Sequence, residues 1–164
     1  MARFAAAVAI LSVIGYGMVW ANPMLAYRVV TQDSFPDLPT TLTANQNILL
    51  FLTGAVPTLL FAAVLWAAKR FFDCYRDGQL FPHAAGTRLK AIGRLCLILA
   101  VVNPIVRTIS MLVISWLNPP GQKQLVLSLS STDGFLLVFS GLLYMIGTIL
   151  AEAVQVAEDN RMIV

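Results

Sequence analysis

The chain has 164 residues, of which 59% are hydrophobic and 12% are charged, and its mean hydropathy is +0.79. Soluble globular domains carry about 25% charged residues, so this composition excludes that class and indicates a single membrane domain. The net charge of +3 is compatible with nucleic-acid binding. The basic residues flank apolar stretches, however, where membrane topology explains them, and no direct contact with nucleic acid is expected.

Four apolar stretches approach or reach the length of a membrane-spanning helix, which needs about 20 residues to cross a hydrocarbon core of about 30 Å. These predicted spans are residues 4–21, 48–68, 95–117 and 135–151. They are separated by outer loops at 22–47 and 118–134 and by a central polar hairpin at 69–94. We therefore expect an all-α membrane protein with four transmembrane helices.

The first stretch has two interpretations. Arg3 and the apolar run after it resemble the start of a signal peptide, and Val19-Trp20-Ala21 resembles a cleavage site. Small residues recur along the run, as they do in packed membrane helices, so an uncleaved first span is the preferred interpretation. The loop that follows contains three prolines and is predicted to be irregular.

The helical pattern of the second span continues beyond its apolar part. Lys69 and Asp73 are four residues apart, which is the spacing of a surface ion pair on a helix. A helix over residues 48–77 would be about 45 Å long, well beyond the thickness of the hydrocarbon core. The second and third helices are therefore predicted to extend into the cytoplasm, joined by a turn at 78–82 with Phe81 packed between them.

The third helix is predicted to begin near residue 83 and to end at the breaker Asn118-Pro119-Pro120. Residues 124–130 alternate at period two, which predicts a short extended segment. Asp133 is placed to cap the fourth span. An acidic tail closes that span, with Glu152, Glu158 and Asp159.

Lysine and arginine residues are distributed unevenly between the two sides of this arrangement. Two fall in the outer loops, whereas eight fall in the termini and the central hairpin: Arg3, Lys69, Arg70, Arg76, Arg88, Lys90, Arg94 and Arg161. Loops rich in lysine and arginine stay on the cytoplasmic side of a membrane. Both termini and the hairpin are therefore predicted to be cytoplasmic, with lipid bilayer around the spans.

Three motifs stand in the hairpin and at the end of the chain. Residues 75–78 are Tyr-Arg-Asp-Gly, Phe81 follows, residues 89–93 are Leu-Lys-Ala-Ile-Gly, and the acidic tail comes after the last span. With these motifs the chain, over roughly residues 61–164, resembles the domain-of-unknown-function 2975 family (YoaS-like), small bacterial membrane proteins with four spans. The resemblance implies a multi-pass protein of the bacterial cytoplasmic (inner) membrane with no established activity. Members are often encoded beside a small helix-turn-helix regulator, so the resemblance implies a soluble regulatory partner more than a reaction.

Arg107 lies inside the third span, about 18 Å from its start. A charge in a membrane span costs about 2.5–3.5 kcal/mol and usually faces the interior of the protein. Asn103 and Ser110 lie one turn to either side and give the helix a polar stripe. One interpretation is an anion or headgroup site, or a small oligomeric channel or transporter. The preferred interpretation is a structural arginine that reaches the outer surface or pairs with Asp133.

The basic hairpin carries the leading functional hypothesis, which is docking of a soluble partner. Its candidate docking residues are Arg70, Arg76, Arg88, Lys90 and Arg94. The acidic tail is predicted to fold back against them through weak ion pairs, which an acidic partner could displace.

The sequence has no nucleophile–base constellation and no phosphate-binding glycine loop, so we expect neither an enzyme nor a cofactor or metal site. Gly147 and Ala151 are four residues apart, a spacing that permits close helix contact within one chain or in a homo-oligomer.

Overall fold

The computed structural model describes residues 2–22, 24–25, 28, 43–75, 84–116, 127 and 129–161. These residues contain no strand, and they form four helices that are long and apolar enough to cross a membrane. The helices are α1 (Ala2–Ala21), α3 (Ala44–Cys74), α4 (Ala84–Ser115) and α5 (Ser131–Arg161). The predicted all-α membrane fold is confirmed.

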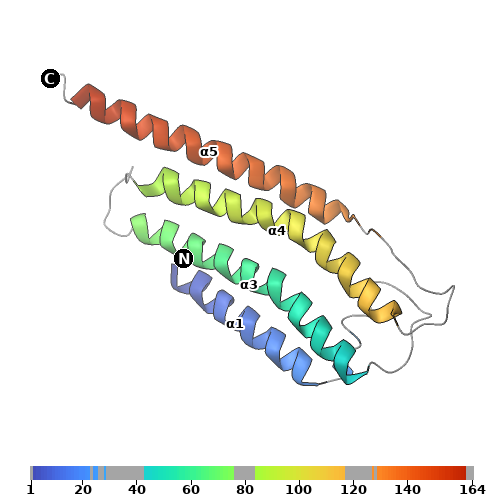
Figure 1. Cartoon of the computed structure of the whole chain (residues 1–164). Helices are drawn as coiled ribbons and strands as arrows, with labels where there is room; N and C mark the ends of the chain where they lie inside the picture. Colours follow the sequence, from blue (N-terminus) through green and yellow to red (C-terminus); the bar gives the residue numbers. More distant parts are fainter. Residues whose placement is uncertain are drawn as a thin grey trace.

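The four helices lie side by side in chain order, and neighbours run in opposite directions (Figure 1). The main contacts join α1 to α3, α3 to α4, and α4 to α5. The start of α1 and the end of α5 lie at the same end of the molecule, where α3 finishes and α4 begins (Figure 1). We call this the basic end, after its residues Lys69, Arg70, Arg88, Lys90 and Arg94.

The second span is longer at both ends than its apolar sequence. The helix α3 begins at Ala44, about one turn before the predicted start, because Gln46 stabilises its first turn. The backbone N–H of Thr43 donates to Gln46 Oε1 at 3.0 Å, which is one half of a capping box. The predicted continuation past the apolar part is confirmed through Cys74. The predicted turn at 78–82 lies outside the described residues.

Asp133 takes part in capping α5, as predicted, but from the first turn of the helix and not as the cap residue itself. The cap residue is Ser130, whose carbonyl oxygen accepts from the N–H of Asp133 and whose Oγ accepts from the N–H of Thr132 at 3.3 Å. Asp133 reaches back, and its Oδ2 accepts from the N–H of Ser130 at 3.0 Å. The helix then continues to Arg161, so the segment predicted as a tail after residue 151 is helical. The extended segment predicted over 124–130 lies largely outside the described residues.

Glycine residues bring α4 and α5 into backbone contact. A Cβ atom on Gly86 would lie 2.5 Å from the backbone nitrogen of Ala151, and one on Gly93 would lie 2.6 Å from that of Tyr144. A Cβ on Gly147 would lie 2.6 Å from the backbone nitrogen of Lys90. Side chains at these positions would hold the helices apart. Gly147 and Ala151 thus serve a contact inside one chain, and they provide no support for a homo-oligomer.

Aromatic side chains join α1 to α3. Tyr16 donates its hydroxyl hydrogen to the carbonyl oxygen of Phe51, and the two rings stack with their centroids 5.5 Å apart. Trp20 packs edge-on against Phe51 at 6.1 Å. Gly54 makes room for the tyrosine, since a Cβ there would lie 2.7 Å from the Tyr16 hydroxyl oxygen.

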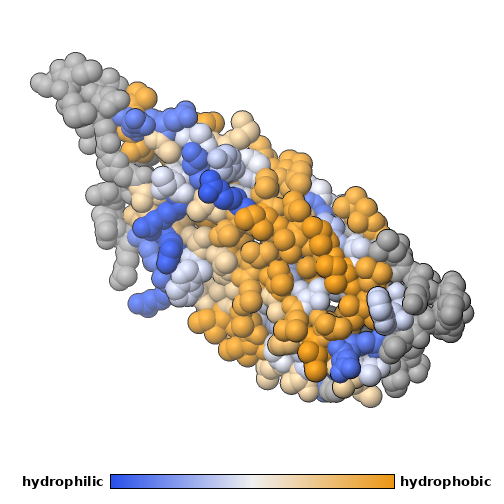
Figure 2. Space-filling view, viewed as in Figure 1, coloured by the Kyte–Doolittle hydropathy of each residue, from blue (hydrophilic) through white to orange (hydrophobic). Residues whose placement is uncertain are grey.

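Large apolar side chains cover the outside of the helices. Phe4, Met18, Phe135, Val138 and Met145 are all more than 60% exposed. Figure 2 shows a broad hydrophobic band across the middle of the visible face, with hydrophilic residues towards both ends. A soluble monomer rarely exposes so large an apolar surface. The band is explained by contact with lipid.

Candidate functional site

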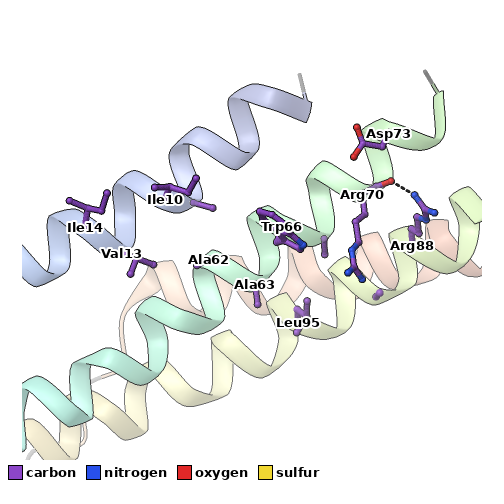
Figure 3. A pocket seen from close by; sticks show the side chains of 13 residues that line it. Ile10, Val13, Ile14, Ala62, Ala63, Trp66, Arg70, Asp73, Arg88 and Leu95 are labelled. Carbon is purple, nitrogen blue, oxygen red and sulfur yellow. Dashed lines mark hydrogen bonds between the residues drawn. The ribbon is translucent and has the colours of Figure 1, made fainter. Parts of the chain in front are cut away.

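At the basic end, α3 remains helical to its last residue, Cys74, and α4 is helical from Ala84. Lys69 Nζ pairs with Asp73 Oδ2 at 2.9 Å, as the spacing predicted. Arg88 on α4 donates from Nη1 to the backbone carbonyl oxygen of Arg70 on α3 (Figure 3). That carbonyl lies one turn before the end of α3, where it also accepts from Cys74 Sγ at 3.5 Å. The hydrogen bond from Arg88 therefore joins the two helices where they leave the apolar region.

The five candidate docking residues do not form one cluster. Arg70 and Arg88 line a groove between α1, α3 and α4. Lys90 comes two residues after Arg88, so it projects from the opposite side of α4, at roughly 200°. It lies towards α5, with Nζ 5.7 Å from the centroid of the Tyr144 ring. Arg94 is exposed, and Arg76 lies outside the described residues.

The predicted contact between the acidic tail and the basic end is wrong for Glu152. This side chain is exposed, and among the described residues it forms no ion pair with Arg70, Arg88 or Arg94. The cause is the orientation of α5. Ala151 faces Gly86 on α4, so the next residue is turned away by roughly 100°. The side chains of Glu158 and Asp159 lie outside what the structure describes.

The second polar site joins α4 to α5 at the opposite end of the molecule. Arg107 Nη2 lies 3.0 Å from Asp133 Oδ1, which is the pairing that the sequence predicted. About 28 Å of α4 separates Arg88 from Arg107 at 1.5 Å per residue, close to the thickness of a hydrocarbon core. The two sites therefore lie near opposite edges of the membrane-spanning region.

The carboxylate of Asp133 accepts two hydrogen bonds, one from each of two different partners. Its Oδ2 accepts the cap hydrogen bond from Ser130, and its Oδ1 accepts from Arg107. The Asp133 side chain is 6% exposed and that of Arg107 is 42% exposed. A carboxylate near a helix N-terminus is also stabilised by the helix dipole. The pair therefore neutralises a charge that would otherwise be costly in the membrane.

Asn103 does not share this contact, although it lies one turn from Arg107 on the same helix. It lines a cavity of about 470 Å³ with residues of α1 and α3, among them Tyr16 and Thr58. The sequence suggested a common polar stripe. The structure instead turns Asn103 towards α1 and α3 and joins Arg107 to α5.

Sequence reasoning missed two residues that matter to these sites. Gln46 is buried, and its Nε2 donates to the backbone oxygens of Val113 and Ile114 at 3.1 and 3.4 Å. It satisfies carbonyls in the last turn of α4, which have no partner within the helix. Trp66 lines the groove, and Lys69 Nζ lies 5.3 Å from the centroid of its ring. The sequence signals that could have found them were the amide of Gln46 and the indole of Trp66, which lie near the two ends of the second span.

Four spanning helices with charged residues at both ends define a multi-pass integral membrane protein. A family model described as "Protein of unknown function (DUF2975)" matches residues 17–164, and the chain belongs to this family. The match covers α3, α4 and α5 and the last turn of α1. No curated protein and no solved structure matches the chain.

Proposed function

We propose that this protein docks a soluble regulatory partner on its basic end, and that the basic end lies in the cytoplasm of a bacterial cell whose inner membrane holds the four helices. The observation that carries the proposal is the hydrogen bond from Arg88 to the Arg70 carbonyl, together with the Lys69–Asp73 pair. These contacts hold basic side chains on helix ends rather than on loose loops. The role is a binding role, with no catalytic step.

The partner that fits is a soluble protein with an acidic surface. Exposed ion pairs are worth less than about 1 kcal/mol each, so several are needed and the complex would be short-lived. Complementary charge of this kind raises the rate of association more than the affinity. By resemblance to the family, a small helix-turn-helix regulator is the expected partner. The start of α1 and the end of α5 also lie at the basic end (Figure 1). Both could add to the surface that a soluble partner contacts.

Transport is the weaker alternative. A channel or transporter that used Arg107 and Asn103 would need both side chains along one path. Arg107 is paired with Asp133 between α4 and α5, whereas Asn103 faces α1 and α3. Neither arrangement favours a polar path across the membrane, so we do not propose transport.

The test uses the full chain in lipid nanodiscs as bait for the soluble fraction of its own cell. Lys90→Glu with Arg94→Glu reverses two charges that lie away from the groove, and it leaves the Arg88–Arg70 hydrogen bond in place. Arg3→Glu is the control, because Arg3 is an exposed basic residue on α1 at the same end of the molecule. Capture of the regulator should be lost in the double variant and retained in the control.

Two results would contradict the proposal. One is capture that survives the double reversal, and the other is failure to recover the soluble regulator with the unaltered chain. Both variants must insert normally for the comparison to hold. Labelling of Cys74 on α3 by a membrane-impermeant maleimide in inside-out vesicles, and not in intact spheroplasts, shows that a variant keeps the orientation of the unaltered chain, since this free cysteine lies at the basic end.

A further inference from the structure

A groove with a cavity of about 1030 Å³ opens between α1, α3 and α4 next to the basic end. Its floor and walls are apolar, and they include Ile10 and Ile14 from α1, Ala63 and Trp66 from α3, and Leu95 from α4 (Figure 3). The small side chain of Ala63 leaves space that a leucine would fill. The volume is at the upper limit of small-molecule sites, which measure about 300–1,000 Å³.

One end of the groove is positively charged. Arg70, Asp73 and Arg88 line it, and Asp73 is already paired with Lys69 at 2.9 Å. Within the described residues neither arginine has a carboxylate partner. A guanidinium carries five N–H donors, and the bond to the Arg70 carbonyl uses one nitrogen of Arg88. Donors of both side chains therefore remain available to an anion.

The charged and apolar parts follow the order of a bilayer. Arg70 comes two residues after Ala68, where the apolar run of α3 ends. The groove extends along α3 from Asp73 to Ala62, about 16 Å along the helix axis. The arginines therefore lie at the level of lipid headgroups, and the apolar floor lies at the level of the acyl chains.

We infer that this groove binds one anionic phospholipid from the surrounding bilayer. Its phosphate is held by Arg70 and Arg88, and one acyl chain lies on the apolar floor beside Trp66. Arginine is suited to phosphate because its planar fork donates two parallel hydrogen bonds. A zwitterionic lipid brings an ammonium group next to two guanidinium groups, so it binds more weakly. Free phosphate gains nothing from the apolar floor.

The test uses Trp66 as the reporter, in the full chain with Trp20→Phe and Trp116→Phe so that no other tryptophan remains. The protein is reconstituted in phosphatidylcholine vesicles, and phosphatidylglycerol or phosphatidylcholine with brominated acyl chains is added in increasing amounts. Bromine quenches tryptophan fluorescence on contact. Half-maximal quenching is expected at an about tenfold lower mole fraction of the anionic lipid, the ratio that one to two cationic contacts provide.

Matched variants separate the groove from general attraction of anionic lipid. Arg70→Gln with Arg88→Gln should remove the preference for phosphatidylglycerol. Arg94→Gln should retain it, because Arg94 is exposed at the same end and does not line the groove. A preference that persists in the double variant, or that Arg94→Gln removes equally, overturns the assignment.

Two further arms exclude other occupants and misfolding. Ala63→Leu fills the floor without altering charge, and it should lower quenching even if the arginine variants fold poorly. Quenching that Ala63→Leu leaves unchanged contradicts the groove. Inorganic phosphate that abolishes the preference at millimolar concentration indicates a soluble anion instead. Quenching that weakens for both lipids as protein density in the membrane rises indicates a second copy in the groove. Either result overturns the lipid assignment.

Discussion

Adding one methyl group at Gly147 tests the close backbone contact between α4 and α5. A Cβ atom there would lie 2.6 Å from the backbone nitrogen of Lys90 and 3.0 Å from the carbonyl oxygen of Gly86. These are backbone atoms of α4, so they cannot rotate away as a flexible side chain would. Gly147→Ala must therefore push α4 and α5 apart over at least one turn.

The cost can be isolated with a second glycine on the same helix. Overpacking a well-packed contact costs about 1–3 kcal/mol, while replacing glycine by alanine in a helix gains up to about 1 kcal/mol. Gly141→Ala carries the same gain, and its Cβ meets no atom within 4 Å. Subtracting the free energy of unfolding of Gly147→Ala from that of Gly141→Ala cancels the effect of helix propensity. The remaining difference should be about 1–3 kcal/mol, with Gly141→Ala the more stable variant.

Both free energies of unfolding can be measured by steric trapping in detergent micelles, with the biotin tags on α4 and α5. Gly141→Ala should be as stable as the unaltered chain or slightly more stable, and Gly147→Ala should be less stable. Equal shifts for the two variants, or a more stable Gly147→Ala, would refute the backbone contact between α4 and α5.

Three further predictions follow from individual contacts. Arg107→Leu and Asp133→Leu should each lower the free energy of unfolding by about 2–3 kcal/mol, because each leaves a charge unpaired; the double variant should cost less than the sum, as a double-mutant cycle will show. Gln46→Leu should cost about 1–3 kcal/mol, measured by the same trapping assay, because it removes the donor of one buried and one part-buried hydrogen bond to carbonyl groups of α4. Impermeant maleimide should label Cys74 in inside-out vesicles and not in intact spheroplasts, and the reverse pattern would overturn the cytoplasmic basic end.

The sequence could predict those features that depend on one chain segment and its solvent. Apolar runs of about 20 residues fixed the number of spans, because the bilayer imposes that length on any helix. The spacing of Lys69 and Asp73 predicted that α3 continues past the apolar run. The pairing of Arg107 with Asp133 was predictable for a related reason. An unpaired charge in a span is costly, and an acidic residue followed in the next helix at the same edge.

The remaining features depend on how helices are rotated and tilted against one another. Gly86 and Gly93 carry no distinct pattern until α5 is placed against them. Of the two acidic residues predicted to contact the basic end, Glu158 or Glu152, Glu152 forms no ion pair there, because close packing of Ala151 on α4 fixes the rotation of α5. The groove is lined by α1, α3 and α4, and α1 and α4 are not consecutive in the row. No local pattern encodes how these two helices lie relative to one another.

The contact between α4 and α5 is of a different type from the contact between α3 and α4, and the second of these links the groove to the docking surface. Backbone contact holds α4 to α5, whereas hydrogen bonds join α3 to α4 near both ends: Gln46 with the last turn of α4, and Arg88 with α3 one turn before its end. A phosphate in the groove would engage the donors of Arg88 that the Arg70 carbonyl leaves free, together with the Arg70 guanidinium on α3. Binding in the groove therefore adds a second link between α3 and α4 at the basic end and leaves the opposite end unchanged. If both proposals hold, the lipid in the groove sets how firmly the end of α3 is held when a soluble partner arrives.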